Sequence, residues 1–472
     1  MLSWIKRGLT SDTGGLWALV AAGVLAVNTA WGQGQGWVGQ CDYATPYAIT
    51  TIAGTPSPGG WADGTNEVAQ FNWPQGLVVT TNRIVYIAEY LNNDVREMKP
   101  VGTNWVVTTI AGTATDSGSA DGTNDTIQFN APTSIAMDGA GNLYVTDGIN
   151  DTIRKLTHVG TNWVSSTLAG TPDGGQGGFS DGTNGAARFN YPSGIAVDAA
   201  TNVYVSDTYN SVIRLLKQVG TNWVVTTIAG QTNAGASFSD GTNQNALFAG
   251  PAGLAIDRAG HLFVGDTTNC VIREITPVGT NWVVTTIAGT GGNYDQYGVI
   301  DGTNGVATFN CPISSGPMAI AVDTNDNLYV ADTGDSLVRK VSPQGTNWVT
   351  TTLAGLYNSP GGGEDGTGTN ATFSELSGIA VDASGELFIA DSLDNDIRLG
   401  VLAPATPPNL AVSRAGGTVI VWWVGAGFTL QTNASLASTN WGVFTNTVTT
   451  TGGTNSVTLS PPAGKLFFRL SD

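Results

Sequence analysis

The sequence repeats itself with a period of 58 to 66 residues. Each unit carries an Ile/Leu-Ala-Gly end, an Asp-Gly-Thr-Asn segment and a Gly-Thr-Asn-Trp segment, with few departures. Between these signatures lie short β-branched runs separated by Gly, Asn and Asp clusters, which predict strands joined by tight turns. One such unit cannot bury both faces of its sheet alone, so a β-rich repeat of this length predicts a propeller.

Strand counting predicts how the propeller closes. Inner strands begin six times, near Gly76, Ser134, Gly194, Gly253, Ala319 and Gly378. Only five of these sets are followed by an outer strand that starts at the Trp of Gly-Thr-Asn-Trp. Residues 47–54 supply the sixth, because Tyr47 stands seven residues before Gly54, as each Trp does before its own Gly. We therefore expect six four-stranded blades, the last of them closed by the N-terminal strand, with no open sheet edge.

The strands also carry the motifs of a known family. Residues 320–323 are Ile-Ala-Val-Asp, residues 328–333 are Leu-Tyr-Val-Ala-Asp-Thr, and similar pairs recur in the other units. The chain resembles NHL-repeat proteins over residues 47–402, with Glu89 in place of Asp and Glu375-Leu376 in place of X-Pro as departures. The resemblance implies a six-bladed β-propeller that binds a ligand or a partner. Some relatives in the wider six-bladed group are enzymes, including lyases and gluconolactonase-type hydrolases.

The residues outside the repeats predict export and a second domain. Lys6 and Arg7 precede an apolar run of 12 residues, which predicts a signal peptide over residues 1–30 and a linker over 31–46, with a short membrane anchor as the alternative. Residues 403–408 are Pro-rich and predict a linker, and 409–472 contain strand patterns that indicate a small C-terminal β-sandwich module. We expect a secreted, periplasmic or cell-surface protein without a membrane span in its mature form.

The charge balance excludes one class of partner. The 36 acidic and 18 basic residues leave a formal net charge of −18, which repels phosphate backbones and excludes nucleic acid. Such a surface tolerates calcium but does not demand it, so we expect no cofactor. We expect a monomer that binds a protein or a glycan.

An acid and an arginine stand seven residues apart in every unit. The pairs are Glu89 with Arg96, Asp147 with Arg154, Asp207 with Arg214, Asp266 with Arg273, Asp332 with Arg339 and Asp391 with Arg398. This spacing puts both side chains across one hairpin, close enough to pair. A catalytic role would require one unit to differ, so sixfold repetition favours structural ion pairs. The Asp-Gly-Thr-Asn segments are likewise expected to be structural turns, because six copies round a ring do not converge on one metal.

The long segments that join one blade to the next are the better candidates for binding. They vary in sequence and carry aromatic residues, namely Trp61, Phe179, Phe238, Tyr294, Tyr297 and Tyr357. Loops on a rigid scaffold often carry binding sites, and aromatics with Gly and Asn suit contact with protein or glycan. The alternative is that these rings pack under their own loops.

Catalytic motifs are hard to find in this chain. It contains only His158 and His261, and neither a serine elbow nor a paired-histidine metal motif occurs. We therefore predict a non-catalytic binding propeller, with a divalent-cation-dependent lactonase or lyase-type enzyme with an axial site as the alternative. The turns that hold Cys270 and Cys311 lie on one face, so these two cysteines are the expected pair if a disulfide forms.

Overall fold

The computed structural model describes residues 45–403, except 57–58, 115, 173–174, 233–237, 292–298, 310–318 and 358–360. It also describes 411–415, 418–424, 429–433, 442–443, 447–451, 454–459 and 467–471. By its internal contacts the chain divides into two compact units, of which one spans Gly36–Ala403 and the other includes Pro404–Asp472. The predicted signal peptide, residues 1–30, lies outside the described residues.

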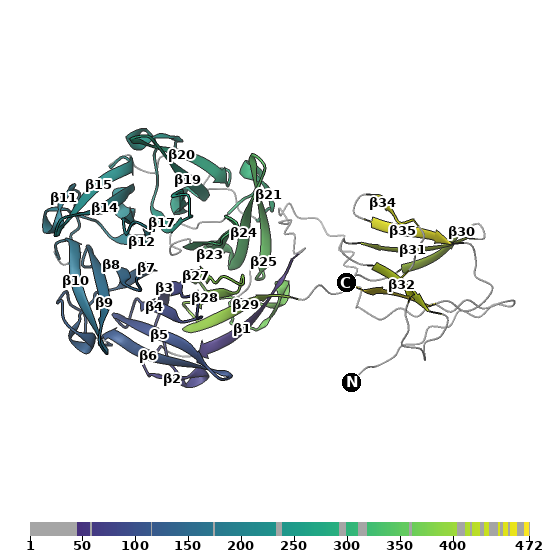
Figure 1. Cartoon of the computed structure of the whole chain (residues 1–472), viewed down its shortest axis with the longest axis horizontal. Helices are drawn as coiled ribbons and strands as arrows, with labels where there is room; N and C mark the ends of the chain where they lie inside the picture. Colours follow the sequence, from purple (N-terminus) through teal and green to yellow (C-terminus); the bar gives the residue numbers. More distant parts are fainter. Residues whose placement is uncertain are drawn as a thin grey trace. The chain divides into compact units, whose positions relative to one another are not determined.

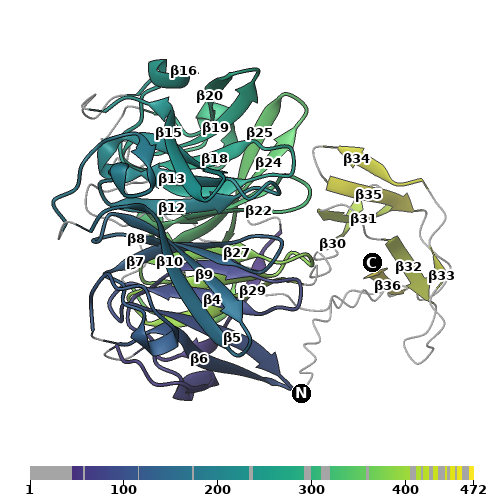
Figure 2. The same cartoon turned by 60° about the vertical axis from the view of Figure 1, so that its left-hand side comes forward.

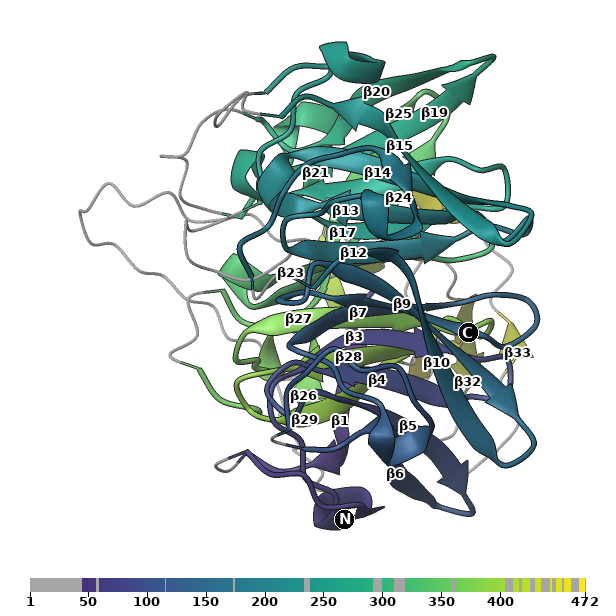
Figure 3. The ribbon, with the colours of Figure 1, turned by 90° about the vertical axis from the view of Figure 1, so that its left-hand side faces the viewer.

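Six sheets surround a central axis in the larger unit, and each forms one blade (Figure 1). From inner to outer, the four main strands are β3 (Pro74–Val79), β4 (Val85–Glu89), β5 (Asp94–Val101) and β6 (Asn104–Gly112) in blade 1; β7 (Pro132–Met137), β8 (Leu143–Asp147), β9 (Thr152–Val159) and β10 (Asn162–Gly170) in blade 2; β12 (Pro192–Val197), β13 (Val203–Asp207), β14 (Val212–Val219) and β15 (Asn222–Gly230) in blade 3. They continue as β17 (Pro251–Ile256), β18 (Leu262–Asp266), β19 (Val271–Val278) and β20 (Asn281–Ala288) in blade 4; β22 (Ala319–Val322), β23 (Leu328–Asp332), β24 (Leu337–Gln344) and β25 (Asn347–Ala354) in blade 5; β27 (Leu376–Val381), β28 (Leu387–Asp391), β29 (Asp396–Leu402) and β1 (Tyr47–Gly54) in blade 6. Figure 3 shows β12 to β15 side by side in this order.

The N-terminal strand closes the ring. β1 pairs antiparallel with β29, from Tyr47 opposite Leu402 to Gly54 opposite Asp396. The all-β fold, the six blades and closure by the N-terminal strand are confirmed. Glu375, which stands where other blades have the residue before Pro, keeps the same left-handed backbone, with φ of 64° against 60° at Trp73 and 53° at Tyr191.

The strands described beyond residue 410 form two sheets (Figure 2). One contains β30 (Ala411–Ala415), β31 (Thr418–Val424), β35 (Thr454–Leu459) and β34 (Thr449–Thr451). The other contains β33 (Gly442–Val443), β32 (Thr429–Asn433) and β36 (Phe467–Ser471).

The blades are wider than the four strands that the sequence predicts. In five blades the Gly-Thr of the Asp-Gly-Thr segment forms a two-residue fifth strand on the outermost strand: β2 (Gly64–Thr65), β11 (Gly182–Thr183), β16 (Gly241–Thr242), β21 (Gly302–Thr303) and β26 (Gly366–Thr367). Blade 2 has a single bridge there, between Thr123 and Val164. The segment predicted as a turn therefore also covers the blade edge, because its backbone can satisfy the groups of the outer strand.

Short 3-10 helices follow these edge strands and some inner turns. Those after the edge segment are η1 (Asn66–Val68), η2 (Asn124–Thr126), η3 (Asn184–Ala186), η5 (Asn243–Asn245), η7 (Asn304–Val306) and η9 (Gly368–Asn370). Those between a second and a third strand are η4 (Thr208–Asn210), η6 (Thr267–Asn269) and η8 (Thr333–Asp335). The first residue of η1, Asn66, accepts the backbone N–H of Trp105 at 2.7 Å, so the Asp-Gly-Thr-Asn and Gly-Thr-Asn-Trp motifs contact each other.

A buried arginine holds each blade together, and blade 3 shows how. Arg214 Nη1 contacts Asp207 Oδ2 at 2.6 Å and donates to the carbonyl of Arg188 at 3.0 Å. Arg214 Nη2 contacts Asp181 Oδ1 at 3.0 Å and donates to the carbonyl of Ser180 at 2.7 Å. One guanidinium thus joins the second and third strands to the segment arriving from the previous blade, through charge-assisted hydrogen bonds.

Each arginine contacts a second acid in addition to the one expected from the sequence, and blade 2 shows this arrangement. Arg154 contacts the expected Asp147, with Nη1 to Oδ2 at 2.8 Å. Its Nη2 also contacts Asp121 Oδ1 at 2.7 Å, and Asp121 belongs to a segment expected to be only a turn. Arg154 is therefore the centre of a triad rather than half of a pair. The seven-residue spacing could not show the second acid, because Asp121 lies 33 residues before the arginine in the segment that enters the blade.

The same triad recurs in all six blades. The hairpin contacts are Arg96 to Glu89 at 2.5 Å, Arg154 to Asp147 at 2.8 Å, Arg214 to Asp207 at 2.6 Å, Arg273 to Asp266 at 2.8 Å, Arg339 to Asp332 at 3.0 Å and Arg398 to Asp391 at 3.2 Å. The Asp of each Asp-Gly-Thr segment contacts the same arginine at 2.9, 2.7, 3.0, 2.9, 2.8 and 2.9 Å in blades 1 to 6. All six arginine side chains are fully buried. The Phe that follows each segment lies under the guanidinium, at 4.9 to 5.5 Å from ring centre to Cζ.

Aromatic rings also connect neighbouring blades. The Trp that opens an outer strand packs edge-on against an aromatic of the preceding blade, as Trp163 does against Tyr86 at 5.7 Å and Trp223 against Tyr144 at 6.4 Å. Edge-to-face geometry of this kind stabilises aromatic pairs beyond their buried area. These rings therefore serve the joints between blades.

Removal of one arginine tests its contribution to stability. We expect Arg273→Met to lower the free energy of unfolding by about 3–5 kcal/mol, because Asp266 is then left buried without its counter-charge. Urea titration measures this change. Lys217→Met removes one exposed positive charge from the third strand of the preceding blade and is expected to change stability by less than about 0.5 kcal/mol. Equal losses in the two variants would contradict the assignment.

Two adjacent blades bury an additional acid at the start of the third strand. Asp94 and Asp396 occupy the position that holds Val212 and Val271 in blades 3 and 4. Burial, followed by the negative charge of Glu89, raises the pKa of Asp94 well above its usual range. Burial also raises the pKa of Asp396, to about 7. Both acids therefore bind protons more tightly in the folded chain than in the unfolded chain.

The pH dependence of stability follows from these raised pKa values. A group with a raised folded-state pKa favours the folded state at low pH, and this contribution is lost as pH rises through that pKa. We expect the free energy of unfolding to fall between about pH 5 and pH 8, with about 2 kcal/mol of the decrease due to Asp396. The double variant Asp94→Val, Asp396→Val should make this decrease smaller and be more stable at about pH 8, whereas buried acids such as Asp147, whose pKa burial raises to about 6, keep the rest of the pH dependence. An unchanged slope in urea titrations would contradict this.

Candidate functional site

The propeller has two faces with different loops, because its strands alternate in direction. The loop face carries the blade-joining segments and the turns between second and third strands. The hairpin face carries the turns between first and second strands and between third and fourth strands. The predicted binding residues belong to the loop face.

The predicted loop aromatics divide into three groups. Trp61 is 60% exposed, and Tyr357 is half-buried. The rings of Phe179 and Phe238 lie 5.1 and 5.0 Å from the Cζ atoms of Arg214 and Arg273, so each pairs with a buried arginine as well as facing solvent. Tyr294 and Tyr297 lie outside the described residues, as does Cys311, the expected partner of Cys270.

An apolar arc on the loop face escaped the sequence analysis. In each blade an acid ends the second strand, and the arc consists of the residue two positions after that acid in blades 6, 1, 2 and 3. These residues are Leu393, Leu91, Ile149 and Tyr209. Leu393, Leu91 and Tyr209 are 54%, 46% and 67% exposed. The equivalent residues of blades 4 and 5 are Thr268 and Gly334. The members are about 60 residues apart in the chain, so only a comparison of the same position in every repeat could have found them.

Three tyrosines connect this arc to the centre of the loop face. The rings of Tyr191 and Tyr209 stack with centroids 4.9 Å apart and planes inclined by 14°. The Tyr191 hydroxyl donates to the hydroxyl of Tyr90, two blades away, at 3.3 Å. Burial, followed by this hydrogen bond, raises the pKa of Tyr191, so its hydroxyl stays protonated at physiological pH. The Tyr191 ring, which is held by this hydrogen bond, therefore supports one face of the Tyr209 ring.

The axial channel narrows in its middle. One aliphatic side chain from each innermost strand lines a cavity of about 70 Å³ there: Leu77, Ile135, Ile195, Leu254, Ile320 and Ile379. Toward the loop face, the Thr133 hydroxyl donates to the carbonyl of Pro192 at 3.0 Å, and the Ser377 hydroxyl to that of Pro74 at 3.1 Å. In the described part of the chain, no group of three or more His, Cys, Asp or Glu is placed to hold a metal ion.

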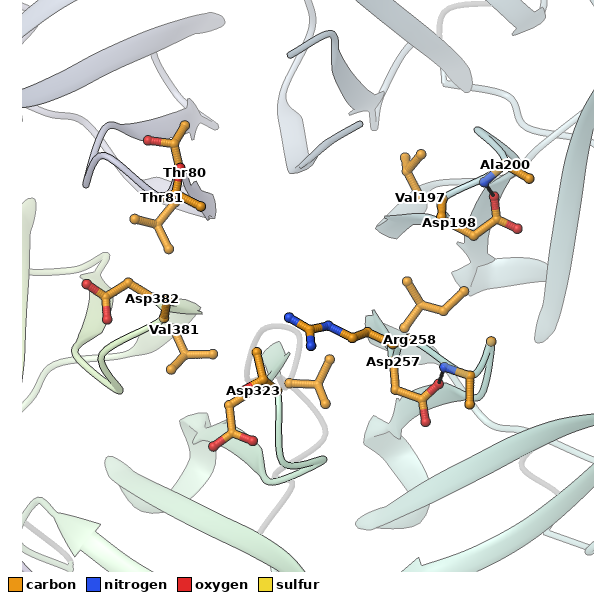
Figure 4. Close-up of a pocket in the computed structure, with 18 residues that line it drawn as sticks. Thr80, Thr81, Val197, Asp198, Ala200, Asp257, Arg258, Asp323, Val381 and Asp382 are labelled. Atoms are coloured by element: carbon orange, nitrogen blue, oxygen red, sulfur yellow. Dashed lines mark hydrogen bonds between the residues drawn. The ribbon is translucent and has the colours of Figure 1, made fainter. Parts of the chain in front are cut away.

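A larger cavity opens on the hairpin face. It has a volume of about 630 Å³ and is walled by Val79, Val197, Ile256, Val322 and Val381 together with first-to-second-strand turns. Figure 4 shows the side chain of Arg258 extending into its middle, whereas the carboxylates of Asp198, Asp323 and Asp382 turn away. This cavity lies on the face opposite the predicted binding loops.

Comparison with known proteins gives relatives of limited similarity. Protein SUPPRESSOR OF QUENCHING 1, chloroplastic, from Arabidopsis thaliana is 28% identical over 307 residues, which are 61% of this chain and 26% of that protein. NHL repeat-containing protein 2 from Homo sapiens is 27% identical over 329 residues, which are 64% of this chain and 43% of that protein. The chain therefore spans less than half the length of these two curated relatives.

The solved structures agree on the fold. An auxiliary nutrient binding protein from Bacteroides ovatus has a TM-score of 0.55 and 15% identity, over 77% of this chain and 78% of that chain. No family model matches the sequence. Within the described residues, no helix has the length and apolar character needed to cross a membrane. The sixfold repeat and the closed ring of blades make this chain a six-bladed β-propeller, and its similarity to NHL repeat-containing protein 2 supports the NHL type.

Proposed function

We propose that this chain is an exported, non-catalytic binding propeller that recognises a protein partner through its loop face. The observation that carries the proposal is the apolar arc, Leu393, Leu91, Ile149 and Tyr209, on four consecutive blades. Export is supported by Lys6 and Arg7, which precede the apolar run of residues 16–27.

The repeat indicates that a blade can form without a large apolar residue at the arc position. Thr268 and Gly334 occupy the same position in blades 4 and 5, and both blades keep their four main strands. Exposed leucine and tyrosine side chains therefore occur where the fold accepts a hydroxyl or no side chain at all. Exposed apolar residues that gather on one face of a protein are typical of an interaction surface.

The chemistry of the arc favours protein over glycan. Leu91, Ile149 and Leu393 offer aliphatic contact that suits the apolar centre of a protein interface. Sugar recognition relies on flat rings combined with hydrogen-bonding groups, and Tyr209 alone among the four arc residues provides such a ring. Trp61 extends the same face toward the rim with an exposed ring. A glycan is therefore the second outcome that the experiment must separate.

The enzyme alternative would need oxygen ligands converging on the axis. The described channel wall consists largely of aliphatic side chains and of hydroxyls that donate to backbone carbonyls of neighbouring blades. Such groups suit a rigid scaffold more than metal-assisted chemistry. The structure therefore favours a binding role.

The triple variant Leu91→Thr, Tyr209→Thr, Leu393→Thr gives each blade the residue type of blade 4. The full chain is screened against secreted proteins and against a glycan array, and the affinity for each hit is measured. We expect a protein hit whose binding the variant weakens at least about tenfold, since residues central to an interface contribute more than ~1 kcal/mol each. The urea midpoint should not change.

Matched controls are the exposed hairpin-face valines Val159, Val219 and Val278, also changed to Thr. This control variant should bind as the unmodified chain does. Binding that is lost in the control but kept in the loop-face variant would contradict the proposal. A glycan hit that depends on Tyr209 but not on Leu91 or Leu393 would assign the face to sugar instead.

A further inference from the structure

We infer that the hairpin-face cavity is a second binding site, which takes a small organic carboxylate with an apolar body and recognises its charge through Arg258. The site lies on the face opposite the proposed partner surface and does not depend on it. Four observations support this inference, namely the shape of the cavity, its walls, the engagement of its aspartates and the placement of Arg258.

The cavity is large enough for a small molecule and is narrowed at its inner end. Its volume of about 630 Å³ lies within the range of ligand pockets, roughly 300–1,000 Å³. Beyond it the ring of six aliphatic side chains lines a cavity of only about 70 Å³. A bound molecule therefore enters from the hairpin face and stops at that ring.

The inner part of the wall carries one aliphatic side chain from each of five blades. Val79, Val197, Ile256, Val322 and Val381 are the last residues of β3, β12, β17, β22 and β27. They suit the hydrocarbon part of a ligand.

The aspartates at the rim accept backbone hydrogen bonds within their own turns. Asp198 Oδ1 accepts the backbone N–H groups of Ala200 at 2.9 Å and Asn202 at 2.8 Å. Asp257, Asp323 and Asp382 accept the equivalent pairs of N–H groups at 2.8 to 3.0 Å. Asp257 Oδ2 also lies 3.0 Å from His261 Nδ1. The aspartates therefore shape the turns, and their negative charges oppose a dianion more strongly than a monoanion.

Arg258 departs from the repeat. The residue after the turn aspartate is Gly139, Ala199, Thr324 and Ala383 in four other blades, so the turn does not require arginine. Arg258 is exposed and extends into the middle of the cavity (Figure 4). No described hydrogen bond or ion pair involves its side chain. A guanidinium presents a planar fork of donors that matches both oxygens of a carboxylate, and a single positive charge matches a monoanion.

Direct binding to the full chain tests the inference. The probes are octanoate, benzoate and phenylacetate, each paired with its neutral primary amide, and phenyl phosphate as a dianion. We expect saturable binding of at least one carboxylate by calorimetry, with its amide and the phosphate at least about tenfold weaker. Absence of saturable carboxylate binding up to about 10 mM would overturn the inference.

Two variants locate the site. Arg258→Thr introduces the residue of blade 5 and should weaken carboxylate binding at least about tenfold, and Ala383→Asp adds a negative charge to the same rim and should also weaken it. Lys217→Thr makes the same charge change as Arg258→Thr on an exposed strand position outside the cavity wall and should leave binding unchanged. Equal affinities of the Arg258→Thr variant and the unmodified chain would overturn the inference. The loop-face triple variant should keep carboxylate binding, so failure of either proposal is distinguishable.

Discussion

Six buried guanidinium groups, one in each blade, determine how this propeller is built. Each contacts two carboxylates, one from the end of the second strand and one from the segment that arrives from the preceding blade. A buried charge without partners is costly, so the arginine forces both segments to meet at one point. These contacts fix the blade-joining segment where it enters the next blade. The shape of the loop face depends on them.

The same contact also joins the two ends of the propeller. In blade 6 Arg398 contacts Asp365 at 2.9 Å, and Asp365 accepts the backbone N–H of Thr51 at 2.8 Å. Thr51 belongs to β1, which precedes the first blade in the chain. The ring therefore closes through the hydrogen bonds of β1 with β29 and through Asp365, which contacts both strands.

A strict repeat separates structural residues from functional ones. Residues that recur in every blade, such as the arginines and the aspartates of the Asp-Gly-Thr segments, contact one another and leave little capacity for a ligand. The candidate sites instead contain residues that differ from their equivalents in the other blades. Tyr209 stands where blade 4 has Thr268, and Arg258 stands where blade 5 has Thr324. In each case another blade forms with a smaller residue at the same position, and the proposed sites rest on that difference.

Much of the repeated framework could be predicted from the sequence, because its contacts follow from spacing along a hairpin. An acid and an arginine seven residues apart, such as Asp147 and Arg154, must face each other when a short turn lies between them. The second acid of each triad, and the loop aromatics, could not be placed in this way. Phe179 and Phe238 stack on buried arginines whose partners come from distant segments, and no local pattern shows that their rings are already engaged.

The sequence by itself determined the number of blades, the strand order and the closure of the ring by residues 47–54. These features depend on periodicity and on hydrogen bonding between neighbouring segments, which a linear pattern records. Only the tertiary structure decided which faces carry sites. The apolar arc and the hairpin-face cavity each collect single residues from several blades, about 60 residues apart in the chain. Their proximity arises when the ring closes and brings equivalent positions around one axis.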